Sequence, residues 1–177
     1  MYNPRHMKTL IIGYGNADRQ DDGVAWYVLS GIARKLGRPI PAVPEDGYFP
    51  EGEEIDLWYD LQLAPEMSAD FAEYDRICFV DAHTGNIEQE IRLHPVADSP
   101  ASSAFTHHLT PAACLALTRS VYGKNPEAVL LSVRGYQFGF ARSLSAETEA
   151  LVEKAIEILW DWVGQGTETG ADASQAS

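Results

Sequence analysis

Three short motifs hold the side chains best suited to chemistry. Asp22 follows Asp21 and precedes a glycine, Asp81 follows the apolar run 77–80, and His107 stands just before a predicted helix. Two carboxylates and one imidazole supply oxygen and nitrogen ligands and leave coordination positions open for a substrate. Such a set suits a divalent transition metal such as nickel or zinc. Either carboxylate could also act as a general acid or base.

Each motif also has a purely structural explanation. An aspartate at a helix start commonly caps the helix, an aspartate after a strand can turn the chain, and a histidine before a helix is often a surface residue. However, Asp21 and Asp22 repel each other and one cap is enough, so one carboxylate is available for chemistry. A histidine at a helix N-terminus is disfavoured as a cation, which keeps the imidazole neutral and able to bind metal. His108 is the alternative to His107.

A glycine-containing loop, Gly13-Tyr14-Gly15-Asn16, follows the first apolar run. Dinucleotide-binding loops need a third glycine at the helix start, whereas this chain has Asp18, whose charge would repel a pyrophosphate. We therefore expect no nucleotide cofactor, and Asn16 should shape the loop or hold a substrate backbone. The sequence has no HExxH, Walker A, GxSxG or CxxC motif, and no serine or cysteine nucleophile with its base.

Alternating strands and helices must position these residues. Strand-like runs are expected at 8–12, 54–63, 76–80, 88–93 and 128–133, with helices beginning near Asp22, Pro65, Thr110 and Ser145. This alternation predicts one three-layer α/β/α domain, with a twisted, mostly parallel sheet of about five strands and helices on both faces. The run 88–93 should lie near an edge because it alternates with charged residues and stops at Pro95. The carboxyl ends of parallel strands would bring the three motifs to one edge.

Composition and length favour one soluble domain. The 177 residues are 45% apolar and 22% charged, which is ordinary for globular proteins. We expect an N-terminal leader at 1–6, a single domain at 7–163 and a flexible tail at 164–177. No secretory hydrophobic region or run of about 18 apolar residues occurs, so a cytoplasmic protein without membrane contact is expected. Cys78 and Cys114 lie in apolar runs and should be buried free thiols.

The charge balance restricts the partners. The chain has 26 acidic against 13 basic residues, a net charge of −13, which argues against nucleic acid as a partner. Such a protein could meet cations or a basic peptide. A monomer is expected. Trp58 and Tyr59, beside Asp60, should pack in the core, with a docking patch for a substrate as the less favoured alternative.

In their order and spacing, these motifs resemble those of the endopeptidases that mature the large subunit of nickel–iron hydrogenases. The resemblance covers most of residues 7–163. It rests on Gly13, Gly15 and Asn16, the pair Asp21-Asp22 before a glycine, Phe79-Val80-Asp81-Ala82, His107-x-Leu109-x-Pro111, and the segment Arg134-Gly135, Phe138 and Leu144-Ser145. Many relatives carry Glu at the place of Asp22, and some have a glycine-rich form of the segment at 60–66.

The resemblance implies a specific activity. Such enzymes remove a short C-terminal extension from the hydrogenase large-subunit precursor after nickel has been inserted. Asp22, Asp81 and His107 would then bind the metal, with nickel delivered as part of the substrate and zinc or cadmium able to substitute. The H-x-L-x-P spacing favours His107 over His108. Asp22 or Asp81 would act as base on a water, or the metal would polarise the scissile carbonyl.

Two other functions remain open from the sequence. A metal-binding or chaperone-like maturation factor could dock on the hydrogenase without cutting it. A peptidyl-tRNA hydrolase has a similar sheet and a similar first loop, but it would show a histidine and an Arg-rich stretch soon after that loop, where this chain has residues 18–22.

Overall fold

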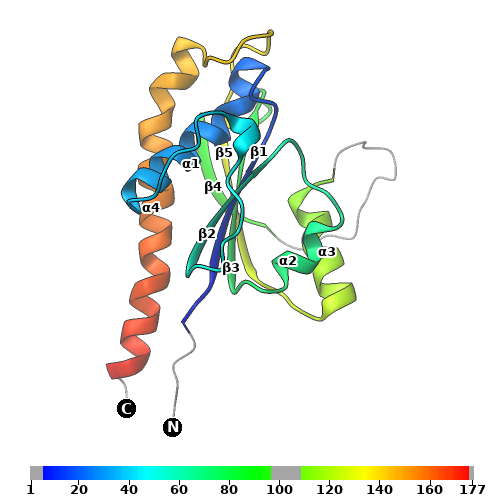
Figure 1. Ribbon diagram of the computed structural model, residues 1–177, viewed down its shortest axis with the longest axis vertical. Helices are drawn as coiled ribbons and strands as arrows, with labels where there is room; N and C mark the ends of the chain where they lie inside the picture. The colour runs from blue at the N-terminus through cyan, green and yellow to red at the C-terminus, as the bar shows by residue number, and fades with distance from the viewer. Residues whose placement is uncertain (1–5, 97–108, 176–177) are drawn as a thin grey trace.

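A central sheet lies between two pairs of helices (Figure 1). The computed structural model describes residues 6–96 and 109–175, with side chains as far as residue 166. One face of the sheet is covered by α1 (Val24–Lys35) and α4 (Ala146–Gln175). The other face is covered by α2 (Met67–Phe71) and α3 (Pro111–Tyr122). The predicted three-layer α/β/α architecture is confirmed.

The sheet has five strands in the order β2-β1-β3-β5-β4. The strands are β1 (Thr9–Tyr14), β2 (Ile55–Asp60), β3 (Arg76–His83), β4 (Ile91–Pro95) and β5 (Glu127–Arg134). The four strands β2, β1, β3 and β5 are parallel, whereas β4 pairs antiparallel with β5. The prediction of a mostly parallel sheet with this short strand at its edge is confirmed.

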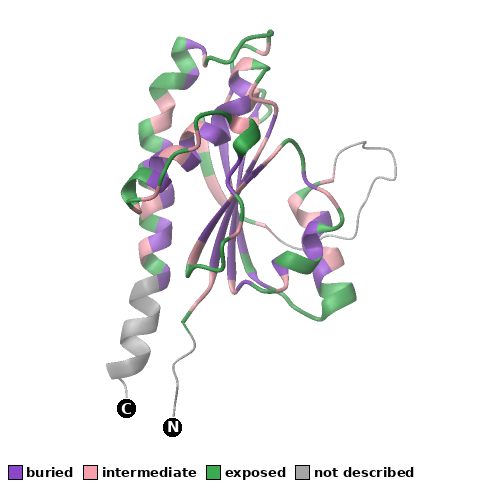
Figure 2. Cartoon of the chain, viewed as in Figure 1, coloured by how far each residue is buried: buried purple, intermediate pink, exposed green. Residues whose placement is uncertain are grey.

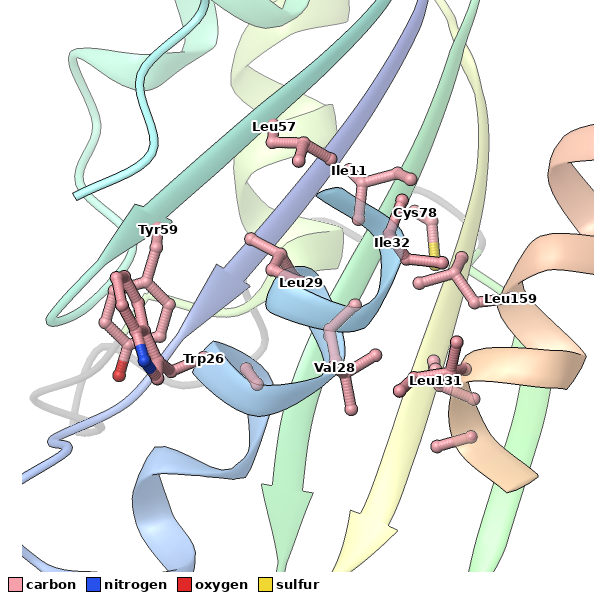
Figure 3. Close-up of a cluster of buried hydrophobic side chains, with 14 of the residues drawn as sticks. Ile11, Trp26, Val28, Leu29, Ile32, Leu57, Tyr59, Cys78, Leu131 and Leu159 are labelled. Atoms are coloured by element: carbon pink, nitrogen blue, oxygen red, sulfur yellow. The ribbon is translucent and has the colours of Figure 1, made fainter. Parts of the chain in front are cut away.

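Alternation along β3 explains why both faces need helices. Cys78 and Val80 belong to the apolar cluster under α1 and α4, whereas Ile77 and Phe79 belong to the cluster under α2 and α3. The four parallel strands accordingly have most of their buried residues in the middle of the sheet, whereas β4, at the edge, has none (Figure 2). In Figure 3, leucine and isoleucine side chains of α1 meet those of the sheet and of α4.

Local signals set the helix ends as expected. The hydroxyl of Thr110 accepts a hydrogen bond of 3.2 Å from the Ala113 amide, and Pro111 occupies the first position of α3. The same helix ends at Gly123, whose φ of 66° suits glycine. Two 3-10 turns, η1 (Gln20–Gly23) and η2 (Pro44–Asp46), lie before α1 and in the loop after it.

The structure corrects several boundaries. The strand expected at 88–93 spans 91–95, and the strand expected at 54–63 spans 55–60. Asp81 lies inside β3 rather than just after it, because β5 pairs with β3 residue by residue as far as His83 and Arg134. The helix α4 continues past residue 164, where the composition changes, and reaches Gln175. Cys78 and Cys114 are buried free thiols, as predicted. Among the described helices, none is long and apolar enough to cross a membrane.

Candidate functional site

Asp81 and Tyr14 lie side by side at the carboxyl ends of two neighbouring strands. Gly13 of β1 pairs with Val80 of β3, so the next residues along the two strands are Tyr14 and Asp81. The Tyr14 hydroxyl donates a hydrogen bond to the Asp81 carboxyl group. Tyr14 packs against the cluster beneath α2 and α3, which places this pair on that face of the sheet.

The loop after β1 brings Asp22 back towards this edge. The backbone amide of Asn16 donates a hydrogen bond of 2.8 Å to Asp22 Oδ2, and the Tyr59 hydroxyl donates one of 2.6 Å to the Gly15 carbonyl. Gly15 has a φ of 143°, and a Cβ atom there would lie 2.0 Å from the carbonyl oxygen of Asp22. Only glycine fits at this position, because any side chain would push the loop away from Asp22.

The two adjacent acids have different roles. Asp21 is fully buried and accepts four hydrogen bonds: from the Tyr136 and Gln137 amides and from the amide and hydroxyl of Ser145. Burial alone would raise the pKa of Asp21, but these hydrogen bonds outweigh it and hold the pKa below 3.8. Asp21 therefore anchors η1 to the start of α4, while Asp22 remains half-buried at the sheet edge.

A cavity of about 520 Å³ contains both Asp22 and Asp81. Its lining is Tyr14, Gly15, Asn16, Arg19, Asp22, Leu61, Gln62, Leu63, Asp81, Ala82 and Leu109. The two carboxylates thus share one space, together with loop residues predicted to contact substrate and with three leucines. A polypeptide segment has both the polar backbone and the apolar side chains that such a lining can accept.

The cavity changes the acidity of Asp81. Burial raises its pKa from 3.8 to about 7, and the negative charge of Asp22 acts in the same direction. Hydrogen bonds from the Ala82 amide and from Tyr14 lower the pKa but do not outweigh burial. A cation in this cavity would offset both effects, because positive charge favours the ionised form of a carboxyl group. A carboxyl group with such a pKa can also exchange a proton near neutral pH.

The remaining predicted site residues fall in different places. His107 and its rival His108 lie outside the described residues, although Leu109, two positions after His107, lines the cavity. Across residues 6–96 and 109–175, no three His, Cys, Asp or Glu side chains form a group that could hold a metal. Gly13 does not line the cavity: a Cβ atom there would lie 2.9 Å from the Ala25 side chain, so this glycine allows α1 to pack closely on β1.

Sequence reasoning missed two residues near Asp81. The sequence assigns Tyr14 to the loop after the first strand, because its neighbour on the adjacent strand depends on the register of β1 and β3. His83, which no sequence motif singles out, lies two positions after Asp81 on the same strand. Trp58 packs against Phe71 and Tyr59 against Trp26, so the expectation that they pack in the core is confirmed.

Known structures share this architecture. The hydrogenase maturating endopeptidase HybD from E. coli superposes with a TM-score of 0.65 at 20% identity, covering 90% of this chain and 93% of its own. The [NiFe] hydrogenase maturation protease HycI from Thermococcus kodakarensis gives 0.57 at 18% identity, covering 92% of this chain and 93% of its own. This chain has the fold of hydrogenase maturation endopeptidases.

A third structure agrees. The hydrogenase 2 maturation peptidase from Thaumarchaeota archaeon SCGC_AB-539-E09 gives a TM-score of 0.56 at 17% identity, covering 89% of this chain and 98% of its own. No protein-family model matches the sequence, and no curated protein matches it either. The resemblance to maturation endopeptidases that the motifs indicated is thus matched at the level of the whole fold.

Proposed function

We propose that this chain is an endopeptidase that removes the C-terminal extension from the nickel-loaded large-subunit precursor of a nickel–iron hydrogenase. The observation that supports it most strongly is the shared cavity of Asp22 and Asp81 in a chain with the fold of hydrogenase maturation endopeptidases. Peptide hydrolysis needs a group that activates water and one that protonates the leaving amine, and two carboxyl groups in one cavity can fill those roles.

Nickel would enter this site as part of the substrate. Asp22 and Asp81 would each offer a carboxylate oxygen, and His107 would add the imidazole nitrogen that the motif spacing favours. The raised pKa of Asp81 supports this assignment, because Asp22 adds a second negative charge to the same cavity and a bound cation would offset both charges. When bound, the metal adds positive charge beside the peptide bond, which polarises its carbonyl group.

The residues around the two carboxylates would orient them and hold the substrate. The Asn16 amide holds Asp22 Oδ2, and the Tyr14 hydroxyl holds Asp81, so neither carboxylate has to be ordered when the substrate arrives. Leu61, Leu63 and Leu109 line the same cavity and would pack against apolar side chains of the extension. Within this frame, Asp22 or Asp81 takes a proton from the attacking water.

The test uses the purified chain with purified hydrogenase precursor. Precursor loaded with nickel and precursor kept metal-free are incubated with the chain, and their masses are measured by mass spectrometry. We expect one defined C-terminal peptide to be released from the nickel-loaded form alone. Stable binding of the precursor without any loss of mass would contradict the endopeptidase and favour a non-cleaving maturation factor.

A further inference from the structure

Two buried N–H groups on neighbouring strands have no acceptor within the part of the chain that the structure describes. They are Nε2 of His83, at the end of β3, and Nε of Arg134, at the end of β5. His83 is only 6% exposed. A buried polar group without a partner costs about 1–3 kcal/mol, so proteins seldom keep one unless water or a ligand supplies the missing bond.

Local hydrogen bonding makes both atoms donors. The Gly85 amide donates a hydrogen bond of 3.2 Å to His83 Nδ1, so Nδ1 is the nitrogen without a proton. The imidazole proton therefore sits on Nε2. Arginine always carries a proton on Nε and keeps its positive charge. The missing partner must consequently be an acceptor, and an anionic one would also balance the charge of Arg134.

The two side chains lie close together. His83 and Arg134 are direct partners in the β3–β5 register. Both also contact Gly85, which has a φ of 100° and where a Cβ atom would lie 2.3 Å from Nη1 of Arg134. Gly85 thus leaves the space that Arg134 occupies and at the same time fixes the imidazole. The guanidinium group also lies over the Tyr136 ring, at 4.6 Å from its centroid.

The pair is also close to the candidate site. Asp81 lies two positions before His83 on β3, and side chains two positions apart share one face of a strand, about 7 Å apart. The nearby carboxylate of Glu90 accepts a hydrogen bond of 2.7 Å from the Tyr136 hydroxyl. That bond holds Glu90 against the tyrosine ring rather than against either unpaired donor.

We propose that His83 Nε2–H and Arg134 Nε–H bind a carboxylate group of the polypeptide substrate, beside the cavity of Asp22 and Asp81. A carboxylate presents two acceptor oxygens in one plane, and hydrogen bonds from a cation to it are about twice as strong as neutral ones. An extended chain spans about 7 Å in two residues. The carboxylate would therefore lie about two residues from the peptide group bound at Asp81, as an acidic side chain or a chain end. This assignment of the substrate rests on the proposed endopeptidase function.

Binding of a carboxylate can be tested without the precursor. The ¹⁵N-labelled chain is titrated with sodium acetate, and with sodium chloride at equal ionic strength, while the side-chain N–H signals of Arg134 and His83 are followed by NMR. We expect acetate, and not chloride, to shift both signals saturably. In Arg134→Gln, the acetate-dependent shift of the His83 signal should vanish. Both shifts should persist in Arg92→Gln, which changes an exposed arginine of β4. If acetate shifts neither N–H signal saturably, or if chloride shifts them equally, the site binds no carboxylate and only water fills it.

Cleavage kinetics separate this subsite from the proposed function. With nickel-loaded precursor, Arg134→Gln should raise KM about tenfold or more, the size expected for a hydrogen bond to a charged group, while kcat stays within about twofold. An unchanged KM with normal cleavage would overturn the carboxylate subsite and leave the endopeptidase in place. If the unaltered chain cuts no precursor but binds acetate through Arg134, the proposed endopeptidase function is wrong. The carboxylate bound at this site would then not come from a polypeptide substrate.

Discussion

Asp21 and Ser145, 124 positions apart in the chain, are joined by two hydrogen bonds of 2.7 Å. The Ser145 amide donates to Asp21 Oδ1 and the Ser145 hydroxyl donates to Oδ2, while the same hydroxyl oxygen accepts a bond of 3.2 Å from the Thr148 amide. The cap of α4 is thus itself held by η1. This arrangement makes Asp21 a structural residue and leaves its neighbour Asp22 for the cavity.

Asp21→Asn should therefore destabilise the fold. An amide keeps one acceptor oxygen and turns its NH₂ group towards donors, so we expect the unfolding free energy to fall by about 2–4 kcal/mol in urea denaturation. Asp22→Asn should cost less than about 1.5 kcal/mol, because Asp22 accepts one backbone hydrogen bond, from Asn16. Equal losses in the two variants would contradict this division of roles.

The acid stability of the chain should depend on Asp21. Its folded-state pKa lies below 3.8, so its ionised form stabilises the fold above that pH, and the stabilisation disappears as the pH falls through the folded-state pKa. In Asp21→Asn this pH-dependent stabilisation is absent at every pH, because asparagine does not ionise. The gap in unfolding free energy between the unaltered chain and this variant should consequently narrow below about pH 4. A gap that stays constant from pH 6 to about pH 2 would contradict the low pKa.

Asp81 should affect stability in the opposite direction. Its folded-state pKa is raised to about 7, so protonated Asp81 favours the fold most at low pH, and this advantage is lost as the pH rises from about 4 through 7. In chelator, to keep the protein metal-free, the unaltered chain should lose roughly 2–4 kcal/mol relative to Asp81→Asn between pH 4 and pH 8. Parallel pH profiles of the two proteins would show that Asp81 ionises as in water.

Gly15→Ala should disturb the site through the backbone. The added Cβ atom would meet the Asp22 carbonyl oxygen at 2.0 Å, so we expect a loss of more than about 2 kcal/mol in thermal or urea unfolding. Gly37→Ala is the matched control, because Gly37 also has a positive φ, of 69°, but a Cβ atom there would meet nothing within 4 Å. That variant should lose only about 1 kcal/mol. Similar losses would indicate that the loop can move away from Asp22.

Metal binding tests the ligand set. In calorimetry, the chain should bind Ni²⁺ or Zn²⁺, and Asp22→Ala, Asp81→Ala and His107→Ala should each abolish the heat of binding. His108→Ala is the control for the adjacent imidazole and should bind as the unaltered chain does. If the three variants bind as well as the unaltered chain, or if His108→Ala alone fails to bind, the proposed ligands of the free protein are wrong.

Helix ends and strand burial could be predicted from the sequence, because they depend on residues close together in the chain. Thr110-Pro111 and Gly123 mark the ends of α3 correctly, because capping involves residues within one turn of each other. The apolar run before Asp81 identified a strand buried on both faces. Pro95, the last residue of β4, marked the end of an edge strand.

The features of the site that the sequence did not predict depend on contacts between distant segments of the chain. The roles of Asp21 and Asp22 differ because Ser145 lies against one of them, and no local pattern contains that contact. Similarly, β3 extends to His83 only because β5 is long enough to pair with it. Tyr14 lies beside Asp81 through the register of β1 and β3, which the two strand sequences alone do not specify.

The central claim is that Asp22 and Asp81 perform peptide cleavage in one cavity. The most direct measurement compares single-turnover release of the C-terminal peptide from nickel-loaded precursor by the unaltered chain, Asp22→Asn, Asp81→Asn and Asp70→Asn, the last an exposed aspartate of α2. We predict rates at least about 100-fold lower for the first two variants and an unchanged rate for Asp70→Asn. Normal release by folded Asp81→Asn or Asp22→Asn would contradict the claim.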